Sequence, residues 1–191
     1  MHKYIAAALL AGSLAVPAYA QEAEPFTGLK VEGLVGYDTT DVEGTDADGL
    51  AYGLGVGFDK QSGKMVFGIE GEATESELSE CVDGVVVPAD TLCARVGRDL
   101  YAGGRVGAVL GSRALLYAKA GYTNARVKTV YDTGAVGTEV RTSENLDGVR
   151  VGAGLEYAFG GKAFAKAEYR YSNYEQGFDR HQGLVGVGLR F

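Results

Sequence analysis

The chain has 191 residues, with 30 Gly, 12 Tyr, 3 Pro and no Trp, and its formal net charge is −7. This length suits one domain, and so much Gly argues against a helical protein, because Gly is costly inside helices. An acidic chain without basic clusters is also a poor candidate for binding nucleic acid, so we expect no nucleic-acid partner.

The N-terminus has the pattern of an export signal. A positive charge precedes a short apolar run, residues 5–16, and small residues follow at the positions that signal peptidase reads. A run of about twelve residues is too short for a membrane-spanning helix. We predict a signal peptide over residues 1–20, cleavage between Ala20 and Gln21, and a mature barrel domain over residues 21–191.

Eight segments of the mature chain alternate between apolar side chains on one face and small or polar side chains on the other. This period of two is typical of β-strands. In the last segment Val185, Val187 and Leu189 alternate with glycines. Each segment has about the length of a tilted strand that crosses a bilayer. The expected strands cover residues 28–37, 50–59, 65–74, 99–110, 115–124, 146–159, 163–173 and 182–191.

The connections between these segments alternate in length. Short polar turns are expected at residues 60–64, 111–113 and 160–162, and longer loops at 38–49, 75–93, 125–145 and 174–180. Short periplasmic turns opposite longer external loops are typical of outer-membrane barrels. We predict an all-β fold, an eight-stranded antiparallel up-and-down transmembrane β-barrel. A soluble lipocalin-like barrel is the alternative, but it would place its apolar face inward.

Four stretches of the chain carry a family resemblance. Residues 116–122, 151–159, 164–171 and 184–191 resemble recurring strands of the bacterial outer-membrane-protein β-barrel family. This family includes porin-family and opacity-like small barrels that are related in fold to the OmpA-type domain. The resemblance implies an eight-stranded barrel in the outer membrane of a Gram-negative bacterium, and it implies no single activity.

The resemblance and the export signal together suggest partners. We expect a monomer in contact with outer-membrane lipid and lipopolysaccharide. The last strand ends at Phe191, which we interpret as the signal read by the outer-membrane assembly machinery.

The parity of the strands places charged side chains on the inner face with the glycines. An eight-stranded barrel is only just wide enough to be filled by its own side chains, and unpaired buried charges are costly. We therefore expect a salt-bridge network that fills the interior. The alternative is a narrow solute path lined by the same residues. The network consists of Lys30, Glu32, Glu70, Glu72, Arg105, Lys119, Arg150, Glu156, Lys166, Glu168, Arg170 and Arg190.

Both cysteines, Cys81 and Cys93, lie in one expected loop. Export places them in an oxidising compartment, so we predict a disulfide between them. No His lies near them, and nowhere in the chain does a cluster of His and Cys have the spacing of a zinc site. We expect neither a metal nor a cofactor.

An enzyme is not expected. The lipid A deacylases resemble this architecture and use a His-x-Ser-Asn motif, but here Arg170 stands where that His would be, two residues before Ser172. A serine nucleophile without a histidine base lacks its proton acceptor. The mature chain's only histidine, His181, is expected at the surface near a strand end.

The long loops are the remaining candidates for function. The first holds five acids and would be solvated, or would bind lipopolysaccharide phosphates through divalent cations. Four basic residues near the outer rim could contact those phosphates directly. They are Arg126, Lys128, Arg141 and Arg180. Three hypotheses follow: a structural envelope protein, a narrow porin for ions or small solutes, and a surface adhesin acting through its loops.

Overall fold

The computed structural model describes residues 24–42, 45–77, 79–83, 90–132, 140–175 and 178–191. Nearly all of these residues are in β-strands, and no helix among them is long and apolar enough to cross a membrane. The predicted signal peptide and its cleavage site, Ala20 and Gln21, lie outside the described residues.

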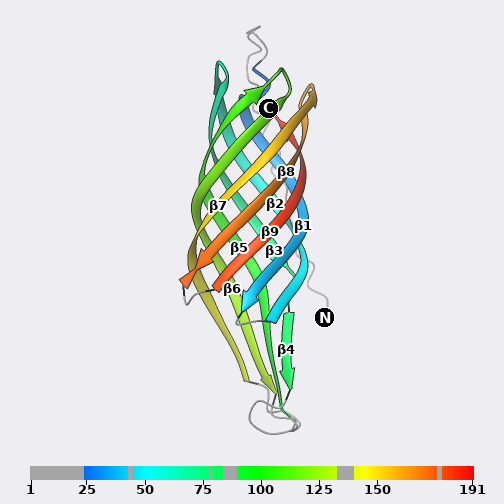
Figure 1. Cartoon of the computed structure of the whole chain (residues 1–191), viewed down its shortest axis with the longest axis vertical. Helices are drawn as coiled ribbons and strands as arrows, with labels where there is room; N and C mark the ends of the chain where they lie inside the picture. Colours follow the sequence, from blue (N-terminus) through cyan, green and yellow to red (C-terminus); the bar gives the residue numbers. More distant parts are fainter. Residues whose placement is uncertain (1–23, 43–44, 78, 84–89, 133–139, 176–177) are drawn as a thin grey trace, which may run out of the picture.

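The strands lie side by side and tilt across the long axis of the molecule (Figure 1). They are β1 (Gly28–Val42), β2 (Thr45–Ser62), β3 (Met65–Ser76), β4 (Ser79–Asp83), β5 (Thr91–Leu110), β6 (Ala114–Asp132), β7 (Val140–Gly160), β8 (Ala163–Tyr174) and β9 (Phe178–Arg190).

All strand pairs are antiparallel, and the sheet closes on itself. The order runs β3–β2–β1–β9–β8–β7–β6–β5, and β5 pairs back onto β3. The short β4 pairs with β5 beyond this ring. In the described part of the chain, eight strands therefore form a closed barrel, and the predicted fold is confirmed.

Several strands are longer than predicted. The loop expected at residues 38–49 is wrong, because the pairing of β1 with β2 continues to the pair Val42 and Thr45. The loop expected at residues 75–93 is wrong as well, since it holds the end of β3, all of β4 and the start of β5. The physical reason is that a hairpin needs an apolar face only within the membrane, while its backbone hydrogen bonds continue into water.

The two ends of the barrel differ. At one end the turns hold Gly63, Gly111 and Gly161 with φ of 60°, 68° and 63°, values that favour glycine. We call this the short-turn end, and Phe191 lies there. At the opposite end the hairpins are extended, and β4, β5, β6 and β7 reach furthest from the barrel (Figure 1). We call this the long-hairpin end.

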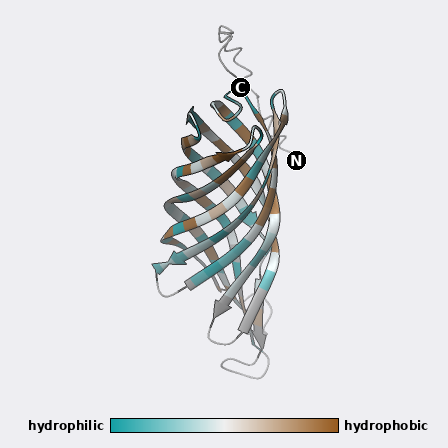
Figure 2. Cartoon of the chain, turned by 45° about the horizontal axis from the view of Figure 1, so that its top comes forward, coloured by the Kyte–Doolittle hydropathy of each residue, from teal (hydrophilic) through white to brown (hydrophobic). Residues whose placement is uncertain are grey.

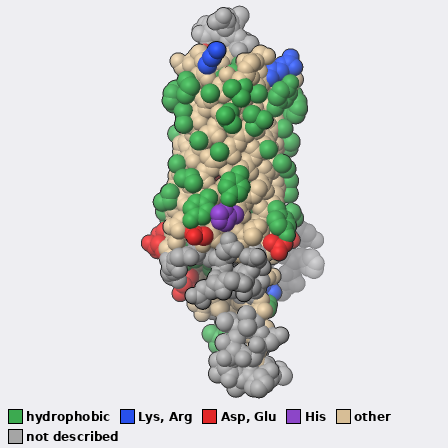
Figure 3. Space-filling model, in the orientation of Figure 1, with side chains coloured by type: hydrophobic (Ala, Val, Ile, Leu, Met, Phe, Trp, Pro, Cys, Tyr) green, Lys and Arg blue, Asp and Glu red, His purple; other side chains and the backbone are tan. Residues whose placement is uncertain are grey.

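The apolar side chains point outward. Leu54, Ile69 and Val187 are 70%, 69% and 67% exposed, while the inward residues of the same strands are buried. Figure 2 shows hydrophobic and hydrophilic residues alternating along the strands. Figure 3 shows a band of hydrophobic side chains across the visible face of the barrel, with charged groups near the band's two edges. This arrangement contradicts the lipocalin-like alternative and suits a surface that contacts lipid.

Candidate functional site: the barrel interior

The structure places all twelve of the charged residues expected in the interior inside the barrel. None is more than 6% exposed. Four further charged residues, Asp38, Asp59, Asp99 and Arg180, are at most 1% exposed and join them. The sequence indicated five carboxylates and seven cations, and these four residues add three carboxylates and one cation. The interior network therefore holds eight carboxylates and eight cations among the described residues.

The middle layer of this network is centred on Lys119. Its Nζ lies 2.8 Å from a Glu70 carboxylate oxygen and 2.9 Å from those of Glu72 and Glu168. Arg170 bridges two of the same acids, with 2.9 Å to Glu72 and a short contact to Glu168. Each charge here has partners from several strands. Two more pairs of the layer are Lys30–Glu70 and Lys166–Glu32, both at 2.8 Å.

A second layer lies toward the short-turn end. Arg105 donates to Asp59 at 2.5 Å and to Glu156 at 3.0 Å. Arg190 lies 2.8 Å from a carboxylate oxygen of each of the same two acids. Two guanidinium groups and two carboxylates therefore alternate around a closed ring of four contacts.

A third layer lies toward the long-hairpin end and is centred on Asp99. Its carboxylate pairs with Arg150 and, at 2.8 Å, with Arg180. It also accepts hydrogen bonds from Thr123 at 2.7 Å and Tyr174 at 3.0 Å. The expectation that Arg180 contacts lipid phosphates at the rim is wrong: β9 begins before this residue, and strand parity turns its side chain inward.

An aromatic ring connects the middle and third layers of charges. The Lys119 Nζ lies 4.5 Å from the centre of the Tyr101 ring, and the Arg150 guanidinium lies 5.4 Å from it. Cations are attracted to the face of such a ring. Tyr101 faces inward by the same parity as Asp99 and Arg105, so extending the alternation of β5 would have identified it from the sequence.

Apolar residues close the short-turn end. Phe26 precedes β1, has no exposed surface, and packs in a cluster with Val66 and Leu115. Its backbone N–H donates to the Gln61 side chain at 3.3 Å, and the Arg190 guanidinium lies 5.5 Å from its ring centre. The segment before β1 therefore enters the barrel mouth and covers the charge network.

The long-hairpin end carries a covalent link. Cys81 of β4 and Cys93 of β5 are direct cross-strand partners and form the predicted disulfide. Nearby, the Tyr131 hydroxyl donates to Asp90 at 2.7 Å. This hydrogen bond raises the pKa of Tyr131, because ionisation of the phenol would break it.

The structure does not pair Ser172, the serine of the deacylase-like stretch, with His181. Ser172 is buried inside the barrel and accepts a hydrogen bond from Arg150 at 2.8 Å. His181 lies on the outer wall, where its Nδ1 is 2.6 Å from the Tyr169 hydroxyl and its ring lies 5.1 Å from that of Tyr171. The barrel wall separates the two side chains.

One group of carboxylates has the spacing of a metal site. Glu32, Glu70 and Glu72 bring oxygen atoms within 4.8 Å of one another inside the barrel. Each of them already contacts a buried Lys or Arg side chain. A divalent cation would have to displace these cations, so the donor set does not fit a metal.

The family is decided by a comparison with family models. The model of the outer membrane protein beta-barrel domain matches residues 6–191. The chain belongs to this family. It is therefore a protein of the outer membrane of a Gram-negative bacterium, and in such barrels the short turns face the periplasm and the long hairpins face outward.

Individual relatives agree with this assignment. The chain is 26% identical over 160 residues to the 25 kDa outer-membrane immunogenic protein of Brucella ovis, which covers 80% of this chain and 69% of the relative. Among solved structures, Neisserial surface protein A superposes with a TM-score of 0.58 at 15% identity, over 86% of this chain and 98% of the other. The attachment invasion locus protein Ail of Yersinia pestis, solved with the heparin analogue sucrose octasulfate, gives 0.57 at 15% identity, over 86% and 100%. These two structures are similar in fold.

Proposed function

We propose that the protein is a structural, non-conducting and non-enzymatic barrel that contributes to the integrity of the outer membrane. The observation that supports this most is the balance of eight cations and eight carboxylates that contact one another in the barrel interior. A passing ion would have to separate such contacts in three successive layers. Removing one partner of a buried pair typically costs about 3–5 kcal/mol, so a permanently open path is disfavoured.

Single-channel conductance of the refolded mature protein in a planar bilayer tests this proposal. We expect no discrete steps from the wild type, provided that its folding is verified by the change in its electrophoretic migration on heating. Arg105→Ala removes the guanidinium between Asp59 and Glu156, and Arg113→Ala, at an exposed turn residue, is the matched control. Steps in the wild type that change in Arg105→Ala alone would contradict the proposal and favour a porin.

A second candidate function is surface attachment through the long hairpins. We infer it from the extension of β5 and β6 beyond the barrel and from the disulfide that fastens β4 to β5. One relative is named an immunogenic protein, and one barrel of similar fold is named an attachment invasion locus protein.

Replacing residues 79–95 by a short turn tests this second candidate. Bacteria that carry the shortened protein should adhere less to host cells than bacteria with the full chain, while the barrel still folds and reaches the surface. Unchanged adherence would rule out this hairpin as the attachment site.

A further inference from the structure

A group of cations lies on the outer side of the wall, just beyond the membrane band. It consists of Arg95 and Arg98 of β5 and Arg126 and Lys128 of β6, and we call it the outer basic cluster. Arg95 and Lys128 are exposed and are direct cross-strand partners, and Arg98 and Arg126 are half-buried. Like charges directly opposite each other destabilise a strand pair. Without a bound anion, this arrangement therefore lowers the stability of the pairing of β5 with β6.

The cluster lacks the ion pairs that the interior has. None of its four side chains forms a salt bridge with a carboxylate of the described residues, whereas every cation of the interior network does. Arg98 and Arg126 donate only to the amide oxygens of Asn124 and Asn145, at 3.4 and 3.2 Å. In the described part of the chain the buried Nε of Arg98 has no hydrogen-bond acceptor. An anion bound at the exposed ends of these four side chains would supply the charge partner that they lack.

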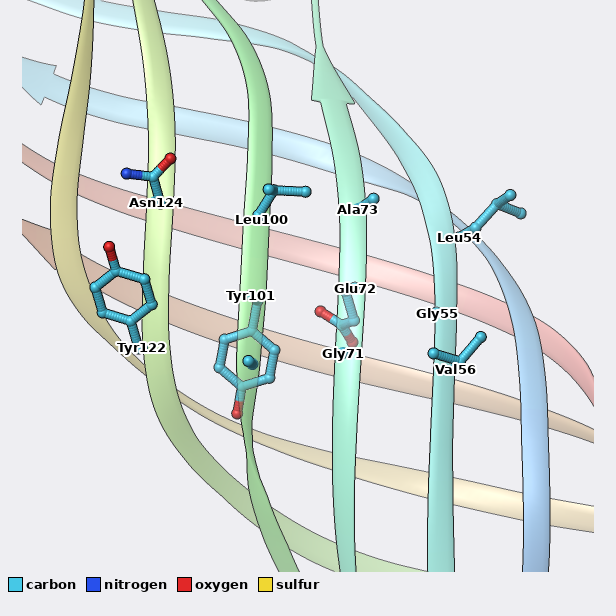
Figure 4. A pocket seen from close by; sticks show the side chains of 11 residues that line it. Leu54, Gly55, Val56, Gly71, Glu72, Ala73, Leu100, Tyr101, Tyr122 and Asn124 are labelled. Carbon is cyan, nitrogen blue, oxygen red and sulfur yellow. The ribbon is translucent and has the colours of Figure 1, made fainter.

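An apolar groove of about 660 Å³ lies on the same outer wall, beside the cluster. Its floor is shallow because the outward residues there are small, Gly71, Ala73 and Ala102, and larger side chains stand at its edges (Figure 4). Leu54 and Val56 stand on one side, Tyr122 and Asn124 stand on the other, and Leu100 lies between the two sides. The groove faces the region that lipid chains occupy.

The cluster and the groove are continuous. Asn124 lines the groove and also accepts the hydrogen bond of Arg98. Lys128 lies four residues beyond Asn124, about 13 Å along the strand. With a strand tilt of about 35–45° this is roughly 10 Å of height, so the cluster spans the lipid headgroup region, which is about 5–8 Å deep on each side of the membrane. The nearby Asp147 carboxylate is occupied by hydrogen bonds from Tyr122 at 2.5 Å and Asn124 at 2.6 Å.

We propose that the outer basic cluster and this groove form one binding site for a phosphorylated glycolipid of the outer leaflet. The guanidinium groups bind phosphate oxygens, for which their planar donor pairs are suited, and an acyl chain lies in the groove. This goes beyond the structural function proposed above and does not depend on whether the barrel conducts. Conductance and lipid retention are separate measurements, so either proposal can fail alone.

The first arm of the test removes the charges. The variant R95Q/R98Q/R126Q/K128Q is refolded, mixed with lipid A in detergent, and its retained lipid A is counted by native mass spectrometry. The matched control is K60Q/K64Q/R113Q/K162Q, which removes four exposed cations at the short-turn end. Because each basic residue near an anionic surface contributes about 1 kcal/mol, we expect at least roughly tenfold weaker retention in the first variant and wild-type retention in the control.

The second arm fills the groove. A Cβ atom added at Gly71 would meet only the Tyr101 carbonyl oxygen within 4 Å, at 3.7 Å, and one added at Gly104 would meet only that of Gly68, also at 3.7 Å. Both positions face outward, but only Gly71 lines the groove. We therefore expect Gly71→Leu to fold and to lose lipid A, and Gly104→Leu to fold and to retain it.

Two results would overturn the proposal. Equal retention by the two charge variants would mean that the cluster binds no phosphate. Equal retention by the two leucine variants would mean that the groove holds no acyl chain, and any loss in the cluster variant would then reflect general attraction to an anionic surface.

Discussion

Asp99 is the residue at which two buried arginines meet. Its carboxylate pairs with Arg150 and Arg180, and both guanidinium groups are fully buried. Such a site is stable only when every buried charge has a partner, because a buried charge that loses its partner keeps its desolvation cost. The contribution of Asp99 is therefore visible mainly when it is removed.

We predict that Asp99→Asn lowers the free energy of unfolding by about 3–5 kcal/mol, because the variant keeps the shape of the side chain but leaves two buried cations with one charge fewer between them. Urea unfolding of the refolded barrel in lipid vesicles measures this. Asp147→Asn is the control, since this carboxylate is exposed, and its effect should stay below about 1 kcal/mol. Equal effects would mean that the buried pairing contributes little.

Strand parity was enough to place most of the interior charges from the sequence. Lys30, Glu70 and Arg150 are examples, since each follows the alternation of its own strand. Asp38 and Arg180 follow the same alternation but were missed, because the strands were ended at the expected edge of the membrane. The identity of the partners could not be predicted, since it depends on how eight strands are staggered around the barrel.

At the scale of elements, the segment before β1 closes one mouth of the barrel. Phe26 fills the mouth of the barrel at the short-turn end and lies over the ring of charges that contains Arg190. This short segment has no periodic pattern of apolar residues from which its position could be predicted. It lies outside every strand, and its position depends on contacts with residues far along the chain, such as Gln61.

We predict that Phe26→Ala destabilises the barrel by about 3–5 kcal/mol, because it empties a closely packed apolar site. It should also admit water to the nearest charge layer and raise the rate of brief current fluctuations in a planar bilayer. Phe159→Ala is the control, since that ring is 58% exposed on the lipid side and removing it opens no mouth. If Phe26→Ala showed no more current fluctuations than the wild type, the charge layers alone would close the interior.

Considered as a whole, the molecule is polarised from end to end. The turns after β2, β5 and β7 are short, while β5, β6 and β7 extend far beyond the opposite end. In an outer-membrane barrel this asymmetry places the long hairpins outside the cell.

Cysteine labelling on intact bacteria checks this orientation. We predict that Ser143→Cys, in the extended part of β7, reacts with a membrane-impermeant maleimide. Ser112→Cys, in the turn after β5, should react only after the outer membrane is disrupted. Both serines are exposed, so access to the reagent is the only intended difference. The reverse pattern would invert the assigned orientation.

The seam between β1 and β9 has a consequence for the order of events in assembly. It joins the first strand to the last, with Lys30 opposite Arg190. Contacts so distant in sequence form slowly, since a long stretch of chain must be ordered before they can be made. Until β9 is in place, β1 and β8 each have an unpaired backbone edge, and such edges pair readily with other chains. The interval between export and closure is therefore the period in which this protein is most prone to aggregation.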